Sequence, residues 1–163
     1  PLYSLPMWSV LKKSRSGGKR VRENKMKDRE QNLMRLAEEA RKFSYCPYSG
    51  FAVGAALLGE NGQIFTGCNI ENAAYGPRNC AERTAVFKAV SEGITSFQAI
   101  AVIGGKKGEK GGFCPPCGVC RQVLGEFVDP DNFQVILGNE DSWKVYTLKE
   151  LLPLGFGRED LEK

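Results

Sequence analysis

Three cysteines and one glutamate of this chain have the residue types and the spacing of a metal-centred catalytic site. Cys80 is followed two positions later by Glu82, and Cys117 and Cys120 form a Cys-x-x-Cys pair directly after Pro116. A structural zinc site closes with four protein ligands, whereas a catalytic zinc keeps one position open for water. Three thiolate ligands beside a carboxylate therefore predict a water-activating zinc centre in which Glu82 moves protons.

The chain has six cysteines and no histidine, so other uses of the thiols have to be weighed. The first alternative is a structural zinc site with a fourth cysteine, taken from Cys114, Cys68 or Cys46. Cys114 is close to the pair in sequence, but the two prolines that follow it stiffen the connection and limit its turning back. Disulfides are the second alternative. They are disfavoured because the N-terminal residues lack the order of a secretory signal, and cysteines that are not exported stay reduced.

Three thiolates create a difficulty for the chemistry. They donate more negative charge than histidines, so a zinc ion held by them acidifies its water less strongly. A positive charge beside the sulfurs would offset this, and Arg83 is the candidate because a guanidinium can donate to thiolate sulfur. Taken alone, Arg83 is typical of a surface residue and Glu82 of a carboxylate in the first turn of a helix. The metal context reverses both interpretations.

Both cysteine groups lie at the start of a predicted helix. Residues 80–91 have apolar side chains at helical spacing and are followed by Gly93, and residues 117–127 form another helix that begins at Cys117. Zinc binds thiolates rather than thiols, and the positive end of a helix dipole lowers a cysteine pKa. We therefore expect the starts of two helices to meet at one ion.

The remaining pattern predicts strands that alternate with helices. A helix from Asp28 to the residues before Pro47 has apolar positions at spacings of three and four, and Asn61-Gly62 indicates a hairpin turn. Alternating strands and helices predict an α/β domain with helices packed on both faces of one sheet. The expected strands are residues 51–58, 63–70, 97–103, 133–137 and 144–147, with a helical turn at 148–152 and a mobile glycine- and lysine-rich loop at 104–112.

Charge divides the chain into two parts. Residues 1–29 contain nine Lys or Arg and two acidic residues, whereas the rest contains 14 basic and 17 acidic residues. We predict that residues 1–27 are a disordered basic leader, since they are polar, glycine-rich and without hydrophobic period, and that residues 28–163 form one zinc-dependent domain. The leader is expected to be a solvated tail, with a nuclear-localisation or nucleic-acid patch as the alternative.

Two classes of partner are disfavoured by composition. The longest mainly apolar stretch, residues 51–58, is far shorter than the roughly 20 residues that a membrane-spanning helix needs. The body of the chain is mildly acidic and offers no basic face of the kind that a dedicated nucleic-acid binder carries. We expect a cytoplasmic protein without a membrane partner, which contacts nucleic acid or enters the nucleus only if the basic leader directs it there.

Several segments together are similar to the cytidine deaminase family, the zinc enzymes of free pyrimidine nucleoside salvage. The two cysteine motifs correspond to the zinc deaminase signature in which cysteine replaces the usual histidine and a glutamate that does not bind the metal acts as acid and base. The similarity extends over roughly residues 30–160 and leaves out the leader. The segments that carry it are residues 46–57, the first loop and strand; 67–73, the substrate strand; 80–85 and 116–122, the zinc motifs; and 150–156, the tail.

The resemblance implies a fold, a reaction and an assembly. The fold is the three-layer α/β/α architecture of cytidine deaminases, with a mixed five-stranded sheet and helices on both faces. The reaction is hydrolytic deamination of cytidine and deoxycytidine to uridine and deoxyuridine, with one Zn²⁺ per chain, and the assembly is a small homotetramer with shared active sites. A polynucleotide deaminase, a blasticidin-type nucleoside deaminase and a non-catalytic zinc-stabilised interaction module are the alternatives.

The resemblance also implies the residues that bind the nucleoside. Asn69 and Glu71 alternate along a predicted strand, so both side chains face the same way and are expected to bind the ribose 3′-hydroxyl. Phe51 is expected to pack on the pyrimidine ring. Without the resemblance these three would be interpreted as a solvated strand face and a core aromatic. The residues expected to complete or close neighbouring active sites across subunits are Tyr48, Tyr75 and Phe156.

Overall fold

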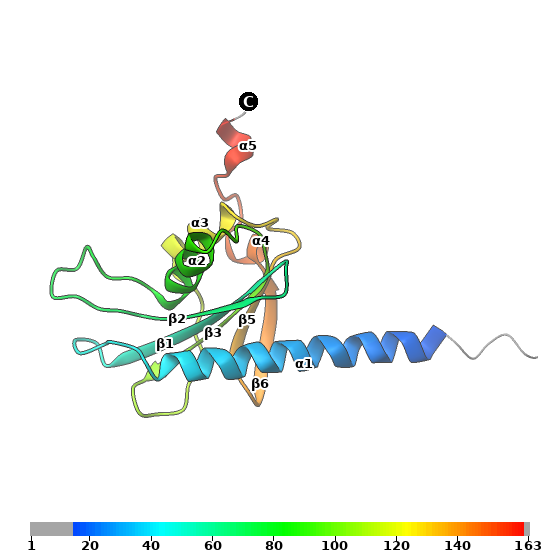
Figure 1. Cartoon of the computed structure of the whole chain (residues 1–163), viewed down its shortest axis with the longest axis horizontal. Coiled ribbons are helices and arrows are strands. Elements are labelled where there is room, and N and C mark those ends of the chain that lie inside the picture. Colours follow the sequence, from blue (N-terminus) through cyan, green and yellow to red (C-terminus); the bar gives the residue numbers. More distant parts are fainter. Residues whose placement is uncertain (1–14, 162–163) are drawn as a thin grey trace, which may run out of the picture.

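A mixed β-sheet forms the middle layer of this computed structural model, which describes residues 15–161 (Figure 1). Five strands follow the order β2-β1-β3-β5-β6, and a two-residue strand, β4, pairs with β3 beside this path. Strands β3 and β5 are parallel, and the other pairs are antiparallel. The predicted mixed five-stranded sheet is confirmed, with β4 as an addition. The strands are β1 Phe51–Gly59, β2 Ile64–Cys68, β3 Phe97–Lys106, β4 Gly112–Phe113, β5 Gln134–Asn139 and β6 Ser142–Thr147.

Helices cover both faces of the sheet, as predicted. In Figure 1 the long helix α1 runs along one face, while α2, α3 and α4 lie on the other. Among the described residues no helix combines the length and the apolar character needed to cross a membrane. The helices are α1 Arg15–Arg41, α2 Ala81–Ser91, α3 Gly118–Gly125, α4 Leu148–Leu151 and α5 Arg158–Leu161.

The alternation of side chains along β1 divides the apolar core into two layers. Ala55 and Leu57 are buried in the cluster that contains the apolar residues of α2 and α3. Ala56 and Leu58 are buried in the cluster on the opposite face, together with the apolar residues of α1. Successive residues of a strand point to opposite faces, so a strand buried on both sides must be apolar at nearly every position. This explains the unbroken apolar run of β1 and completes the three-layer α/β/α architecture.

A glycine on the edge strand lets helix α2 lie directly against the sheet. A Cβ atom at Gly67 of β2 would lie 2.4 Å from the Ala81 carbonyl oxygen and 2.6 Å from the Ala85 amide nitrogen. Any larger residue at this position would therefore push α2 away from the sheet. Gly67 thus helps to determine where the N-terminal end of α2 stands.

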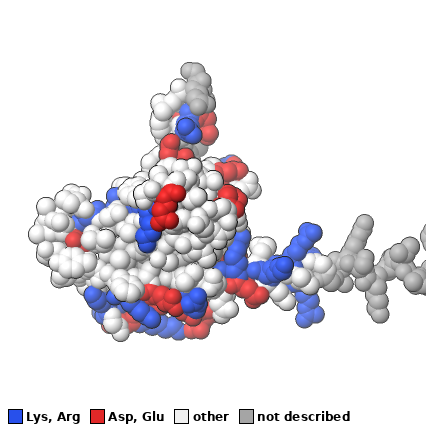
Figure 2. Space-filling view, viewed as in Figure 1, with Lys and Arg blue, Asp and Glu red and all other residues white. Residues whose placement is uncertain are grey.

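The N-terminal helix is longer than predicted. We expected a disordered leader over residues 1–27, but α1 begins at Arg15, so the expectation of disorder is wrong for residues 15–27, and residues 1–14 lie outside the described part of the chain. The side chains of residues 18–28 are exposed, and Figure 2 shows basic side chains gathered along this projecting part of α1. The division of the chain at residue 27 stays a prediction.

The glycine- and lysine-rich segment at residues 104–112 is more ordered than we expected. Its first residues extend β3 as far as Lys106, and Gly112 begins β4. The buried guanidinium of Arg41 donates from Nη2 to the carbonyl oxygens of Lys106 at 2.8 Å and Glu109 at 3.0 Å. The connection is therefore shorter than expected and covers residues 107–111. The bonds that hold it come from a distant helix and leave no mark on the local sequence.

Candidate active site

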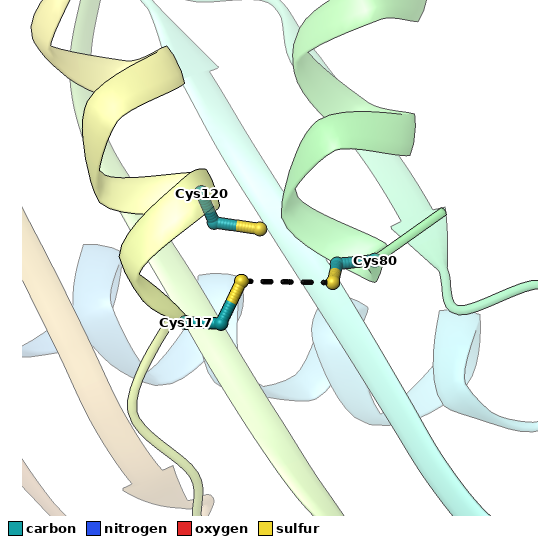
Figure 3. Close-up of side chains that lie close together, drawn as sticks. All are labelled: Cys80, Cys117 and Cys120. Atoms are coloured by element: carbon teal, nitrogen blue, oxygen red, sulfur yellow. Dashed lines mark hydrogen bonds between the residues drawn. The ribbon is translucent and has the colours of Figure 1, made fainter. Parts of the chain in front are cut away.

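Three cysteine thiols meet where the N-terminal ends of α2 and α3 converge (Figure 3). Cys80 and Cys117 are the N-cap residues of the two helices, both in extended backbone conformation and neither using its side chain to cap the helix. Cys120 follows in the first turn of α3 and is fully buried. The thiols therefore stand at the positive ends of two helix dipoles, as the sequence predicted.

The spacing of the sulfur atoms fits a zinc ion. All three lie within 4.8 Å of one another, and the Cys80 and Cys117 sulfurs are 3.9 Å apart. Tetrahedral zinc with Zn–S bonds of about 2.3 Å places its sulfur ligands about 3.8 Å apart. Within residues 15–161, no cysteine, aspartate, glutamate or histidine joins these three as a fourth member of the group, and all six cysteines are free. The four-cysteine and disulfide alternatives therefore receive no support.

Arg83 lies beside the sulfurs, where we expected it. Its Nη2 donates to the Cys80 sulfur at 3.5 Å. The pKa of Cys80 is lowered to about 5, chiefly by a hydrogen bond from the Cys120 thiol and also by Arg83 and the Cys117 thiol. The same hydrogen bond and burial raise the pKa of Cys120. The negative charge is thus concentrated on Cys80, next to the guanidinium, and the compensating role of Arg83 stays a prediction.

Glu82 is a buried carboxyl group in the first turn of α2. It is only 4% exposed. Burial raises its pKa to about 7, the charge of Cys80 adds to this, and a hydrogen bond from the backbone N–H of Glu82 opposes it. A carboxyl whose pKa lies near neutrality can both take up and release a proton at physiological pH, which is what an acid–base catalyst requires.

Asn69 lies just beyond the end of β2, which stops at Cys68 although we predicted a strand as far as residue 70. Its side-chain amide bridges the start of β1: Oδ1 accepts from the Val53 N–H at 2.8 Å, and Nδ2 donates to the Phe51 carbonyl at 2.8 Å. Nδ2 carries a second N–H that these bonds do not use. The amide is therefore held in place by the backbone and still has one donor to offer.

Glu71 is held in the same way by the loop that precedes β1. Its Oε2 accepts from the backbone N–H of Tyr48 at 2.9 Å and of Ser49 at 3.3 Å. Hydrogen bonds from the Ser49 side chain and the Tyr48 backbone hold the pKa of this carboxyl below its ordinary value. Glu71 is therefore an oriented carboxylate at neutral pH, able to accept a hydrogen bond from a ligand hydroxyl.

A cleft of about 400 Å³ brings several of the predicted residues together. Asn69, Glu71 and Tyr75 line it, and so do Cys80 and Arg83 of the metal site. The two polar residues expected to bind a ribose thus face the same hollow as a metal ligand. The cleft joins the predicted nucleoside contacts to the predicted metal centre.

The other predicted aromatic residues lie outside the lining of this cleft. Phe51 is 42% exposed and its ring edge lies over Gly104, where a Cβ atom would come within 3.0 Å of Cε1. Tyr48 and Phe156 are exposed at the surface, and Tyr75, which does line the cleft, has the Arg78 guanidinium 4.5 Å from its ring centre. A single chain therefore does not gather all six predicted substrate contacts.

Cys114, which we considered as a candidate fourth zinc ligand, lies close to the site but is not a member of the three-cysteine group. A Cβ atom at Gly104 would come within 2.6 Å of its sulfur, which places Cys114 beside the ring of Phe51. Burial raises the pKa of Cys114 to about 11, and the charges of Glu82 and Cys80 add to the shift. Cys114 is thus a neutral thiol at physiological pH. In the sequence, only its position three residues before Cys117 indicated that Cys114 lies near the site.

Comparison with known proteins shows what the chain is similar to. Residues 27–135 match the family described as the cytidine and deoxycytidylate deaminase zinc-binding region. A cytidine deaminase of Sporosarcina psychrophila is 47% identical over 131 residues, which are 80% of this chain and 93% of that protein. A cytidine deaminase of Halalkalibacterium halodurans is 49% identical over 132 residues, which are 80% of this chain and 96% of that protein.

Solved structures agree with these relatives. The crystal structure of cytidine deaminase from Burkholderia pseudomallei has a TM-score of 0.69 at 45% identity and covers 77% of this chain and 97% of that one. The crystal structure of cytidine deaminase from Mycobacterium tuberculosis has a TM-score of 0.64 at 37% identity and covers 77% of this chain and 94% of that one. The similarity therefore covers most of the described domain.

Proposed function

This chain belongs to the cytidine and deoxycytidylate deaminase zinc-binding family, and from that premise we propose that it hydrolyses cytidine and deoxycytidine to uridine and deoxyuridine with release of ammonia, in pyrimidine salvage. One observation carries the proposal. Cys80, one of three cysteine thiols at zinc spacing, lines the same cleft as Asn69 and Glu71, and the buried Glu82 lies two residues after it. This arrangement offers a metal site, a proton carrier and oriented polar groups for a sugar.

Zinc is the cofactor of this family, and we assign its ligands to Cys80, Cys117 and Cys120. When bound, the ion supplies a water that is acidic enough to act as a nucleophile at neutral pH. Zinc binds the thiolate form of cysteine, and Arg83, which donates to the Cys80 sulfur at 3.5 Å, favours that form at Cys80.

Glu82 carries the protons of the reaction. Its carboxylate takes one proton from the attacking water and delivers it to N3 of the pyrimidine ring. It then takes the remaining proton of the hydroxyl that has added to C4 and delivers it to the amine, which leaves C4 as ammonia. Burial, which raises its pKa to about 7, allows both directions of transfer at neutral pH. Positioned proton transfer of this kind contributes about 10²- to 10⁴-fold to the rate.

The nucleoside is held at its two ends. The unused N–H of Asn69 donates to the ribose 3′-oxygen, and the Glu71 carboxylate accepts from the 3′-hydroxyl. Phe51, with its ring partly exposed over Gly104, packs on the pyrimidine. A polynucleotide continues past its 3′-oxygen, so these contacts favour a free nucleoside over a strand.

We propose further that the chain works as a cytoplasmic homotetramer whose subunits share active sites. Tyr48, Tyr75 and Phe156 are 58%, 73% and 60% exposed, so each presents most of its side chain to solvent. A neighbouring subunit would cover these rings and complete the pocket with them. Sedimentation at working concentration should give a tetramer. The basic segment at residues 1–27 takes no part in the reaction, so its deletion should leave activity unchanged.

The direct test is to mix the purified chain with cytidine and follow the ultraviolet change as it becomes uridine. Glu82→Gln should keep zinc and nucleoside binding but lose most of its turnover, because the amide cannot carry the proton. The matched control is Glu92→Gln, at an exposed glutamate that caps the other end of α2. Near-normal rates in Glu82→Gln would refute the assignment. Absence of turnover in wild-type protein that holds one zinc per chain would favour a polynucleotide substrate or a structural zinc module.

A further inference from the structure

Two neighbouring side chains on α3 reach from the metal centre to the C-terminal part of the chain. Arg121 and Gln122 directly follow the last of the three metal-site cysteines. Arg121 donates from Nε to the Pro116 carbonyl at 2.8 Å and from Nη1 to the Leu151 carbonyl at 2.6 Å. One side chain thus ties the backbone just before the Cys-x-x-Cys pair to the end of α4.

Gln122 makes the next contact, with the C-terminal tail (residues 152–157). Its Nε2 donates to the Phe156 carbonyl at 2.9 Å. Other hydrogen bonds of the tail are local, from the Leu152 N–H to the Leu148 carbonyl and from the Gly155 N–H to the Leu152 carbonyl. Pro153 to Phe156 are exposed, and Leu154 stands fully in solvent with a left-handed backbone, φ 57°. A segment with few buried contacts opens locally at low cost, so a single hydrogen bond has a large influence on its position.

We infer that Gln122 is a positioning residue for Phe156, with Arg121 anchoring the start of the same tail, so that the helix bearing two of the cysteines also determines where the aromatic ring is presented. The Gln122 side chain bonds to the backbone of Phe156 and leaves its ring free. The direction of the ring therefore follows the direction of a backbone that α3 holds. The metal site and the tail are built on one rigid element.

This inference rests on the proposed function, in which Phe156 completes an active site. Gln122 touches no reacting atom, so its loss should weaken nucleoside binding and spare the chemical step. The KM for cytidine should rise about three- to tenfold, which corresponds to the loss of one hydrogen bond, while kcat and zinc content stay at wild-type values.

The test is a double-mutant cycle in the full zinc-loaded chain, with Gln122→Ala, Phe156→Ala and the double variant. Two further variants distinguish the loss of the hydrogen-bond donor from a change in the shape of the side chain. Gln122→Glu is isosteric but cannot donate, so its KM should rise as in Gln122→Ala, whereas Gln122→Lys keeps a donor and should restore most of the affinity. In the Phe156→Ala background, Gln122→Ala should change the KM less than twofold, because it acts through that residue.

Amide hydrogen exchange supplies a readout that does not depend on turnover. Gln122→Ala should speed exchange over residues 152–157 and leave α3 unchanged. Three results would each overturn the inference. The first is that the KM effects in the cycle are additive, and the second is that the KM is unchanged in Gln122→Ala but raised in Phe156→Ala. The third is that amide exchange over residues 152–157 is unchanged in Gln122→Ala. Failure of the wild-type chain to deaminate cytidine would instead overturn the proposed function, and the exchange result would still decide whether Gln122 holds the tail.

Discussion

The metal end of the cleft and its aromatic rim are built in different ways. At the metal end, Cys120 is fully buried and Glu82 is 4% exposed, and both lie on helices packed against the central sheet. At the rim, Tyr75 lines the cleft and is 73% exposed, while Phe156, outside the lining of the cleft of its own chain, is 60% exposed, and both lie outside any helix or strand. The first region is complete within one chain, and the second leaves large apolar surfaces uncovered.

The two regions therefore contribute to the proposed enzyme in different ways. The metal end supplies groups whose protonation and charge depend on burial, and burial is available inside a single domain. In the assembly that we propose, the rim supplies contact area for a nucleoside, and its rings gain that function when another subunit covers them. Substitutions at the metal end should therefore act on zinc content and kcat, whereas substitutions at the rim should act on KM and assembly.

The largest effect is expected from removing a thiol of the metal end. Cys120→Ala should lose zinc and reduce turnover to background, because two thiolates cannot hold the ion and binding requires the deprotonated sulfur. Treatment of the wild-type chain with a strong chelator should have the same result, reversed by added zinc. Metal analysis and the cytidine assay measure both.

Cys68→Ser is the matched control for the loss of a thiol. Cys68 ends β2, and burial raises its thiol pKa, but it is not a member of the metal group. This variant should keep one zinc per chain. Equal loss of zinc from the two variants would mean that the ligand set is wrong.

A smaller effect is expected from removing the charge beside the sulfurs. Arg83→Met should weaken zinc binding or turnover about 10- to 100-fold, as loss of a residue that supports a metal ligand commonly does. Arg83→Lys should recover part of the loss, since it keeps the charge but not the planar guanidinium. Arg35→Met, at an exposed arginine of α1, should be neutral in the same assays. Wild-type kinetics in Arg83→Met would show that the thiolates need no compensation.

The smallest effect is expected from titrating Glu71 near the rim. Its folded pKa is depressed by the bonds from Ser49 and Tyr48, so its contribution is present above the ordinary pKa and is lost as pH falls through the folded value. The wild-type KM should therefore stay flat down to about pH 5 as far as this group is concerned. Glu71→Gln should raise the KM a few-fold at every pH in that range. A wild-type KM that already rises as the pH falls through neutrality would contradict this assignment.

The parts of the site that sequence could predict are those encoded locally. Cys80 and Cys117 mark the starts of two helices, and Arg83 lies one turn from Cys80, so helical geometry alone brings their charges together. The same holds for β1, because an unbroken apolar run between turns is typical of a strand buried on both faces. These elements appeared where they were expected.

The parts that could not be predicted depend on contacts between distant residues. The glycine and lysine content of residues 104–112 is typical of a loop, yet Arg41 holds the carbonyls of Lys106 and Glu109 from another element. Asn69 was expected on a strand, but it lies beyond the end of β2, where its side-chain amide bonds to the backbone of β1. No local pattern contains these bonds, because each joins segments that meet only after folding.

Subunit complementation tests the contrast between a self-contained metal end and a shared rim most directly. Chains carrying Glu82→Gln and chains carrying Phe156→Ala would be co-expressed with different tags, and assemblies containing both would be purified and assayed with cytidine. Shared sites predict that some pockets combine an intact Glu82 with an intact Phe156 from another subunit, so that turnover with the wild-type KM reappears. A mixed assembly that shows only the raised KM of Phe156→Ala would contradict the account, because each pocket would then be complete within its own chain.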